Sequence, residues 1–288
     1  MFDALLTGVL AWGPCEVGDK EESMNDPTRG APPLLYTTRP GLGEPKRGKV
    51  RDIYDFGDHL LLVASDRISA FDVVLPDGIP EKGILLTQLS RFWFDWIGAR
   101  GIAHHLISTD FDAFPASCLP DRATLEHRSM WVRKSRPLPV ECIVRGYLAG
   151  SGWTEYQKHG TIADEPLPSG LNESARLPTP IFTPSTKAPV GQHDVGISFK
   201  QMASEIGADL AEEVRTLSLS IYGQASAWAE ARGILIADTK MEFGLDCETG
   251  QLLVIDELLT PDASRFWPKV TYQPGGPQPS YDKQFVRD

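Results

Sequence analysis

Charged and uncharged side chains alternate along residues 236–243. Asp238, Lys240 and Glu242 occupy every second position, and uncharged side chains stand between them. Because successive side chains of a β-strand point to opposite faces, the pattern predicts a strand whose charged residues share one face. We therefore expect two carboxylates and one ammonium group to meet on one side of a sheet.

A second strand is predicted to return beside the first. Asp246 and Gly250 supply turn chemistry between two apolar runs, which is typical of a hairpin. The returning run, 252–257, ends in Asp256 and Glu257. If the numbers of paired residues add to an even sum, Asp256 lies on the charged face, whereas an odd sum places Glu257 there. Either register brings several carboxylates into one patch.

Two interpretations of this acidic patch are open. The charges fit the solvated face of an edge hairpin. However, residues 235–237 and 252–255 are continuous apolar runs, which are typical of strands covered on both faces. Carboxylates on a covered strand repel one another and need a cation, and Lys240 alone does not balance them. Mg²⁺ takes one or two carboxylates and completes its shell with water and substrate phosphates, so this interpretation predicts nucleotide chemistry.

The first half of the chain predicts a lead-in, strands and one long helix. Residues 24–46 are rich in proline and glycine and predict irregular structure. Two strand-like runs meet at a hairpin centred on Gly57, and a further strand over 68–75 ends at the breaker sequence 76–80. Apolar residues at helical spacing predict a helix over 83–101.

The second half predicts further strands and two helices. Strands are expected over 129–135 and 140–150, and the prolines between them predict a boundary between two lobes. The proline-rich segment 165–195 has weak periodicity and predicts a long active-site loop. Two helices are predicted within 198–233, the first of them capped by Ser198.

Composition narrows the class of protein. The formal net charge is −11, from 28 basic and 39 acidic residues, which disfavours a general binder of nucleic acid or of anionic membranes. The four cysteines form no Cys-x-x-Cys pair, and no stretch reaches the roughly 18 apolar residues that span a bilayer. We therefore expect reduced thiols, a cytoplasmic protein, and small-molecule partners rather than nucleic acid or membrane.

The beginning of the chain is predicted to be an optional extension. Its first apolar run lacks a basic flank and contains Asp3, which argues against a signal peptide. Met24 fits a natural start equally well, and residues 1–23 carry no motif with a chemical role.

Several standard motifs are missing from the sequence. It contains no G-x-x-x-x-G-K-[ST] loop, no G-x-G-x-x-G, no H-E-x-x-H and no G-x-S-x-G. Nucleotide binding is therefore expected to use another scaffold.

Basic residues cluster at the start of the first predicted hairpin. Lys49 and Arg51 fit either solvated surface or a strand face that binds triphosphate oxygens. Shortly afterwards, predicted strand ends bring together Asp66, Arg67, Ser69 and Asp72. Ser69 and Asp66 fit either turn caps or site residues.

Two further arginines stand beside hydroxyl groups. Arg145 precedes Ser151 by six positions, and glycines flanking Ser151 let backbone amides approach an anion. Ser264 and Arg265 follow the acidic hairpin, next to two aromatic residues. An arginine beside aromatic rings is more often bound to a partner than idle.

Eight segments, in this order, closely resemble the phosphoribosylaminoimidazole-succinocarboxamide synthase (SAICAR synthetase) family of purine biosynthesis. The resemblance runs from about Arg47 to Asp288 and implies an ATP-dependent ligase. Such an enzyme joins 5-amino-1-(5-phosphoribosyl)imidazole-4-carboxylate, here called the ribotide, to L-aspartate, giving SAICAR, ADP and phosphate. The segments are "GKVRDIY", "SDRISAFD", "IPEKGILLT", "VECIVRGYLAGSGW", "FTPSTKAPVGQHD", "ADTKMEFG", "IDELLTPDASRFW" and "YDKQFVRD".

The resemblance implies a nucleotide site in the first half of the chain. Lys49 and Arg51 match residues that contact ATP phosphates. Glu141 and Cys142 match the hinge that receives adenine, and Lys82 belongs to a further motif on the nucleotide side.

The resemblance also assigns the acidic hairpin. Glu242 and Asp256 match residues that hold Mg²⁺, and Lys240 faces the phosphates. Together with Asp238 and Arg265, Lys240 is expected to act in catalysis.

Substrate binding is implied at a further group of residues. Arg145, Ser151 and Arg265 match positions that bind the ribotide phosphate or the aspartate carboxylates. Similar site motifs, without a defined role for each member, contain Asp72, Lys187, His193, Asp194 and Ser264.

The implied fold is α+β with a kinase-like or ATP-grasp-like nucleotide cleft. Residues 1–46 form the extension and lead-in, 47–138 a small, mostly antiparallel lobe that covers the nucleotide, and 139–288 a larger mixed lobe for substrate and metal. Family members usually continue as a helical tail, so the end at Asp288 predicts a trimmed or absent terminal helix. Another carboxylate–amine ligase and a non-catalytic nucleotide sensor stay open as alternatives.

Overall fold

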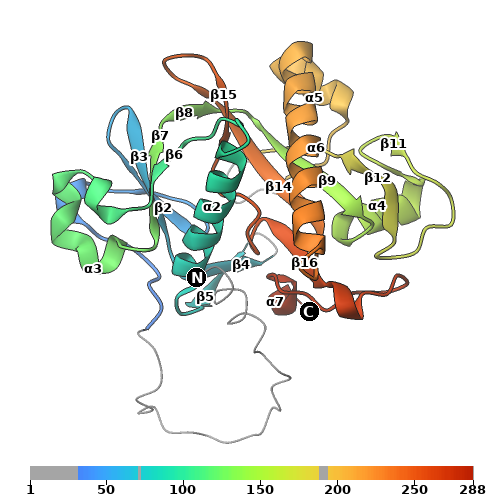
Figure 1. The fold of residues 1–288 in the computed structure, drawn as a ribbon, viewed down its shortest axis with the longest axis horizontal. Helices are drawn as coiled ribbons and strands as arrows, with labels where there is room; N and C mark the ends of the chain where they lie inside the picture. Colours follow the sequence, from blue (N-terminus) through green and yellow to red (C-terminus); the bar gives the residue numbers. More distant parts are fainter. Residues whose placement is uncertain (1–31, 71–72, 188–193, 288) are drawn as a thin grey trace, which may run out of the picture. The chain divides into compact units, whose positions relative to one another are not determined.

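The computed structural model of the chain describes residues 32–70, 73–187 and 194–287. Residues Pro33–Asp288 form one compact unit built from antiparallel sheets and helices (Figure 1). This architecture confirms the predicted α+β class. No helix in the described part of the chain is long and apolar enough to cross a membrane.

A five-stranded sheet occupies the first half of this unit. Its strand order is β1-β2-β3-β7-β6, and the β2–β3 hairpin turns at Gly57, whose φ of 85° favours glycine. The N–H of Gly57 donates to Asp55 Oδ1 at 2.9 Å, which confirms the predicted hairpin. The strands are Lys46–Arg47 (β1), Arg51–Asp55 (β2), His59–Ala64 (β3), Leu106–Ser108 (β6) and Ser129–Arg133 (β7).

A seven-stranded sheet forms the second half, with β14 at its centre. The path β12-β9-β14-β15 is extended by β13 on β9 and by β16 and β8 on β14. Because β14 is paired along both edges, the interpretation as an exposed edge hairpin is wrong. The strands are Ser135–Pro137 (β8), Val140–Tyr147 (β9), Arg176–Phe182 (β12), Ser185–Thr186 (β13), Ile234–Asp246 (β14), Leu252–Ile255 (β15) and Ser264–Pro268 (β16).

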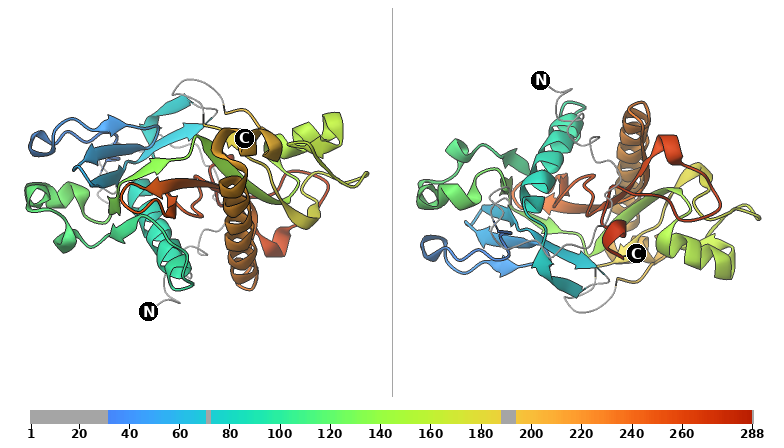
Figure 2. Two further views of the ribbon diagram at one scale, coloured as in Figure 1. Left: turned by 90° about the horizontal axis from the view of Figure 1, so that it is seen from above. Right: turned by 90° about the horizontal axis from the view of Figure 1, so that it is seen from below.

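Two long helices, α2 and α6, lie side by side against these sheets (Figures 1 and 2). Phe92 and Trp93 of α2 contact Trp228 of α6, with ring centroids 5.2 and 5.4 Å apart. Ser198 caps α5 through a complete capping box with Gln201, as predicted. The helices are Lys82–Gly98 (α2), Arg122–Leu125 (α3), Gly150–His159 (α4), Phe199–Ile206 (α5), Ala208–Glu230 (α6) and Gln284–Arg287 (α7).

Short elements complete the fold. The 3₁₀ turns are Pro40–Leu42, Phe111–Ala113, Ala116–Asp121 and Lys269–Thr271, and two small hairpins consist of Arg67–Ala70 (β4) with Val73–Gly78 (β5) and of Thr161–Ile162 (β10) with Glu165–Pro166 (β11).

The prediction of one strand over 68–75 is wrong, because the chain forms the β4–β5 hairpin there, with Ala70 opposite Val73. Strand β5 also continues through Pro76 instead of ending before it. Proline is tolerated because β5 pairs only with β4, so its missing N–H is not needed by another strand.

The prediction of an unbroken loop over 165–195 is also wrong in part. Strands β12 and β13 pair with β9 within this segment, although the register of β12 shifts between Arg176 and Ile181. Two prolines, Pro178 and Pro180, fall inside this shift and hide the strand from sequence periodicity. The helix predicted over 83–101 is correct but ends earlier, at Gly98.

Candidate active site

A cavity of about 750 Å³ collects most of the residues that the sequence singles out. Its lining comes from the start of β2, from β9 and β14, and from the loops after β13 and β15. The predicted site residues found in this lining are Lys49, Arg51, Glu141, Arg145, Ser151, Lys187, Asp194, Asp238, Lys240, Glu242, Asp256, Ser264 and Arg265. Their individual roles stay predictions.

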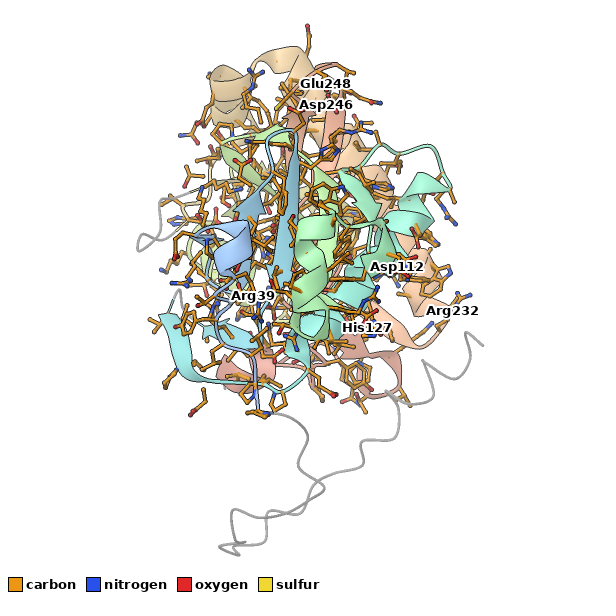
Figure 3. All side chains as sticks on the ribbon, turned by 90° about the vertical axis from the view of Figure 1, so that its left-hand side faces the viewer. Arg39, Asp112, His127, Arg232, Asp246 and Glu248 are labelled. Atoms are coloured by element: carbon orange, nitrogen blue, oxygen red, sulfur yellow. The ribbon has the colours of Figure 1, made fainter. Side chains whose placement is uncertain are left out.

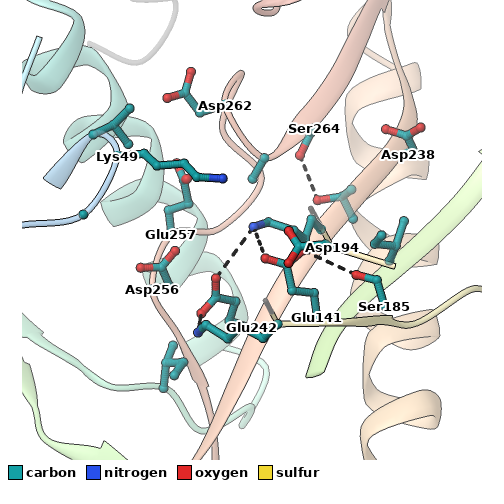
Figure 4. Close-up of a pocket in the computed structure, with 18 of the residues that line it drawn as sticks. Lys49, Glu141, Ser185, Asp194, Asp238, Glu242, Asp256, Glu257, Asp262 and Ser264 are labelled. Atoms are coloured by element: carbon teal, nitrogen blue, oxygen red, sulfur yellow. Dashed lines mark hydrogen bonds and ion pairs between the residues drawn. The ribbon is translucent and has the colours of Figure 1, made fainter. Parts of the chain in front are cut away.

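Strand β14 provides the floor of the cavity by simple alternation. Lys240 and Glu242 are partly exposed toward the cavity, whereas Met241 and Phe243 are fully buried in the core behind the strand. Lys240 Nζ lies 2.6 Å from Glu141 Oε1 and 3.7 Å from Glu242 Oε1 (Figure 4). Glu242 also accepts a hydrogen bond from Lys187. The charged face predicted from the sequence is therefore present.

The register of β14 with β15, and the backbone just after β15, determine which acidic side chains lie on that face. Glu242 pairs with Ile255, so the numbers of paired residues add to an odd sum. With strict alternation, Glu257 but not Asp256 would lie on the same face as Glu242. Strand β15 ends at Ile255, however, and Asp256 adopts a left-handed φ of 71°. Both Asp256 and Glu257 consequently line the cavity. At the other end of the hairpin, Asp246 accepts the N–H groups of the turn (Figure 3).

Arg51 and Lys240 both face carboxylates in this part of the cavity. Arg51 donates to Asp256, and its Nη2 lies 3.4 Å from Glu257 Oε1. Burial lowers the pKa of Arg51, but attraction to Asp256, Glu257 and Glu242 outweighs it, so the pKa ends above its usual range. The pKa of Lys240 behaves in the same way, with burial outweighed by Glu242 and Glu141. Both cations are therefore charged at neutral pH.

Asp238, which lies apart from Glu242 and Asp256 in Figure 4, belongs to a second charged group in the cavity lining. It stands between two arginines. Asp238 Oδ2 is 2.6 Å from Arg265 Nη1 and 3.4 Å from Arg145 Nη1. Arg145 also donates through Nε to Thr183 Oγ1 at 3.0 Å and through Nη2 to Ser151 Oγ at 3.2 Å. Arg145 and Arg265 supply two cations to this group, and the acids Glu155 and Asp282 also act electrostatically on them.

Helix α4 begins where the sequence predicts a small-residue turn. Gly150 has a φ of 55°, and a Cβ there would lie 2.3 Å from Arg265 Nη2. The positive φ favours glycine, and any larger residue would also have to displace the Arg265 guanidinium. The first turn of α4 places Ser151 beside Arg145, where a helix N-terminus favours an anion.

Comparison with known proteins explains why these groups occur together. A family model described as SAICAR synthetase matches residues 44–288. The chain belongs to the SAICAR synthetase family. It is 58% identical over 256 residues to the phosphoribosylaminoimidazole-succinocarboxamide synthase of Pelobacter propionicus, covering 89% of this chain and 86% of that protein. The corresponding values for the enzyme of Geobacter sulfurreducens are 55% over 255 residues, 88% and 85%.

Solved SAICAR synthetase structures share the fold. The Saccharomyces cerevisiae enzyme in complex with SAICAR matches with a TM-score of 0.79 and 47% identity, covering 86% of this chain and 83% of that one. A SAICAR synthetase in complex with ADP matches with a TM-score of 0.68 and 26% identity, covering 85% and 90%. The family resemblance predicted from the sequence motifs is thereby confirmed.

Within the described ranges, two predicted SAICAR synthetase site residues, Lys82 and Cys142, do not line the cavity. Lys82 is buried behind it and forms an ion pair of 2.6 Å with Asp262, which does line the cavity. The Cys142 side chain is fully buried in the hydrophobic core and does not belong to the cavity lining. Asp72 and His193 lie outside the described residues.

The side chain of Glu141, a residue predicted at the adenine hinge, contacts a residue predicted at the ATP phosphates. Its carboxylate binds Lys240, the residue expected at the phosphates, and Ser185 Oγ lies 3.5 Å away. Burial raises the pKa of Glu141, although Lys240 opposes the shift. The contact of Glu141 with adenine stays a prediction.

The cavity also contains residues that the sequence analysis did not assign. Ser185 and Asp262 lie within segments that resemble the family, and their hydroxyl and carboxylate groups could have identified them as candidate site residues. His105 could not be identified in this way, because it is brought to the cavity by pairing with Val254 across the sheets. Burial lowers the pKa of His105 to about 3, so its imidazole is neutral.

The carboxylates of the cavity fit a Mg²⁺ ion bound jointly by the protein and by substrate phosphates, rather than a metal bound by protein side chains alone. Within the described ranges, no group of three or more acidic, histidine or cysteine side chains is arranged to hold a metal ion. Glu242, Asp256 and Glu257 nevertheless all line the cavity, and each of them attracts the Arg51 guanidinium. Such a donor set fits an ion that takes one or two carboxylates and relies on substrate phosphates for the remainder.

Proposed function

We infer that this chain catalyses the ATP-dependent joining of the ribotide to L-aspartate, giving SAICAR, ADP and phosphate in de novo purine biosynthesis. The observation that carries the inference is the cavity of a SAICAR synthetase family member with cations on two sides, one beside carboxylates and one beside Ser151. ATP and the ribotide both carry phosphate, and two separate cationic groups provide a place for each.

We place the ATP phosphates at Lys49, Arg51 and Lys240. Arg51 contacts Asp256 and Glu257. Lys240 contacts Glu242, and Lys49 lies beside Glu257 in the same cavity lining (Figure 4). Glu242 and Asp256 would hold Mg²⁺ there. When bound, the ion neutralises charge on the phosphates. Residues 47–138 would cover the nucleotide, while residues 139–288 would supply most of the remaining site.

We place the ribotide phosphate and the aspartate carboxylates at Arg145, Ser151 and Arg265. Arg145 is buried among polar partners and presents its guanidinium beside the start of α4. Asp238 holds both arginines in place, and Lys187, Asp194 and Ser264 lie in the cavity lining around the substrates.

The reaction would proceed through an acyl phosphate. A carboxylate oxygen of the ribotide attacks the γ-phosphorus of ATP, and the bond to ADP breaks. The aspartate amine then attacks the acyl carbon and loses a proton, and phosphate leaves with the former carboxylate oxygen. Lys49, Arg51 and Lys240 stabilise the negative charge that moves during phosphoryl transfer.

A direct test is ADP release by the purified chain with Mg²⁺ and ATP. We expect ADP to form only when both the ribotide and L-aspartate are present, in a 1:1 ratio to SAICAR. ADP release with another acid or amine, but not with these two, would indicate a different carboxylate–amine ligase. ATP binding without turnover would indicate a nucleotide sensor. A cytoplasmic location belongs to the same proposal, because ATP and L-aspartate are supplied there.

Replacing Arg145 with lysine should weaken binding of the ribotide far more than binding of ATP. Arg145 uses Nε, Nη1 and Nη2 on three different partners, and an ammonium group cannot reproduce this geometry. We expect the Kd of the ribotide to rise roughly 10–100-fold, since truncating a charged hydrogen-bonded group costs about 2 kcal/mol or more. Titration calorimetry with each ligand measures the two constants. Arg176→Lys, at an ion pair outside the cavity, is the control, and equal losses for ribotide and ATP would refute this placement.

A further inference from the structure

A buried arginine outside the cavity holds the loop that carries Lys49. Arg67 is 2% exposed and does not belong to the cavity lining, whereas Gly48, Lys49 and Val50 do. Its Nε donates to the carbonyl of Lys49 at 3.0 Å, and its Nη2 donates to the carbonyl of Gly48 at 3.0 Å. Arg67 therefore contacts the backbone of the loop from behind.

Ser65 holds the next carbonyl of the same loop. Its N–H and Oγ both donate to the carbonyl of Val50, at 3.0 and 2.7 Å. Three successive carbonyls, from Gly48 to Val50, are thus bound by two residues of one short segment. Because C=O and N–H point in opposite directions in a trans peptide, the amides that follow these carbonyls are turned away from Arg67.

Arg67 is itself fixed by a buried network. Its Nη2 lies 2.9 Å from Asp52 Oδ1, and Asp52 is fully buried. Asp52 Oδ2 accepts hydrogen bonds from the N–H and Oγ1 of Thr37, at 2.8 and 2.7 Å. Tyr54 in turn donates to Thr37 Oγ1 at 2.8 Å. The position of the guanidinium is therefore determined on every side by rigid partners.

We propose that Arg67 is a positioning residue for the nucleotide, fixing the backbone of residues 48–51 so that Lys49 and Arg51 are held at the ATP phosphates. The proposal rests on the function proposed above. Arginine is required because its planar group offers five N–H donors in a fixed arrangement. A lysine offers three donors at one point and cannot reach both carbonyls and Asp52 together.

The same lobe offers a matched control. Arg128 is also buried, and its Nη1 also contacts a carboxylate and a carbonyl, Asp66 Oδ1 at 2.9 Å and that of Ala64 at 3.3 Å. Among the residues that the structure describes, its hydrogen bonds go to Asp66 and Ala64 and not to the 48–51 loop. Arg67→Lys and Arg128→Lys therefore disturb similar buried pairs, but only the first disturbs the loop.

The experiment compares full-length Arg67→Lys, Arg128→Lys and Lys49→Met by calorimetric titration with ATP and Mg²⁺ and with SAICAR, together with thermal unfolding. We expect Arg67→Lys to raise the Kd of ATP tenfold or more and the Kd of SAICAR less than twofold. Arg128→Lys should lower the unfolding temperature comparably and change the Kd of ATP less than twofold. Lys49→Met should weaken the binding of ATP as Arg67→Lys does.

Two results would overturn different parts of this account. If Lys49→Met weakens ATP but Arg67→Lys affects ATP no more than Arg128→Lys does, Arg67 is only structural, and the proposed function stands. If Lys49→Met leaves ATP binding unchanged, the placement of the phosphates is wrong.

A milder pair of variants keeps the test valid if Arg67→Lys does not fold. Ser65→Ala removes one donor to the Val50 carbonyl, and we expect at least a threefold rise in the Kd of ATP. Ser129→Ala is the control, because Ser129 is buried and its Oγ has no hydrogen-bond partner among the described residues. Equal ATP affinities for these two variants would contradict the proposal.

Discussion

Replacing Lys240 with methionine is expected to lower kcat by roughly 10²–10³-fold, the range found when one preorganised donor to a developing charge is removed. Methionine keeps the length of the side chain but removes the ammonium group that lies 2.6 Å from Glu141 and 3.7 Å from Glu242. Because the cation is expected to act on the transferring phosphoryl group, the rate should fall more than ATP affinity does. Single-turnover ADP formation at saturating ATP, with the Kd measured separately, distinguishes these effects.

Lys134 provides a matched control for this substitution. Its side chain is 37% exposed, against 36% for Lys240, and it forms an ion pair of 2.7 Å with Asp55 outside the cavity lining. Lys134→Met should therefore leave turnover unchanged. If Lys240→Met reduces the rate no more than Lys134→Met does, Lys240 has no part in phosphoryl transfer.

Glu242→Gln and Asp256→Asn are each expected to raise the Mg²⁺ concentration for half-maximal rate and to lower the saturated rate by roughly 10²-fold or more. A metal ion supplies several kcal/mol of charge stabilisation in such reactions, and neutral amides keep size while losing charge. Since both carboxylates would serve one ion, the double variant should be little worse than the poorer single variant. The measurement is a double-mutant cycle on turnover across a Mg²⁺ titration.

Glu230 tests whether loss of any paired carboxylate has this effect. Like Glu242, it contacts two cations, Arg176 at 3.0 Å and Lys269 at 3.2 Å, but it lies outside this cavity. Glu230→Gln should leave the Mg²⁺ dependence unchanged. Additive free energies for Glu242 and Asp256, with an unshifted Mg²⁺ dependence, would refute a shared metal.

Local sequence patterns predicted the structure correctly wherever neighbouring residues determine it. The alternation from Asp238 to Glu242 predicted the charged face of β14, because strand geometry alone sets it. Ser198 and Gly57 predicted a cap and a turn for equally local reasons. The conserved order of short motifs, compared with a known family, supplied the residues that the fold later brought into one cavity.

Features that depend on distant pairing could not be predicted. The register of β14 with β15 was open, and the left-handed backbone of Asp256 ended the alternation that would have excluded it. His105 reaches the cavity only through pairing with Val254. The contact between Glu141 and Lys240 spans two strands of the sheet, so neither residue alone indicated it.

Prolines caused a different kind of error. Pro76 and the prolines of β12 indicated breaks, yet these strands tolerate a missing N–H where no neighbouring strand needs it.

The proposed role of Arg67 could not be predicted from local sequence patterns, because its contacts are with distant residues. Its partners in the 48–51 loop and in Asp52 become visible only when β4 is placed against β2 by the fold.

We infer that ATP activates the ribotide carboxylate in this cavity before the aspartate amine attacks. The most direct measurement uses ribotide labelled with ¹⁸O in its carboxylate, followed by mass spectrometry of the inorganic phosphate released with ADP. An acyl phosphate transfers one carboxylate oxygen to phosphorus, so we predict one ¹⁸O in each phosphate formed. Phosphate without ¹⁸O, released together with SAICAR, would contradict the account.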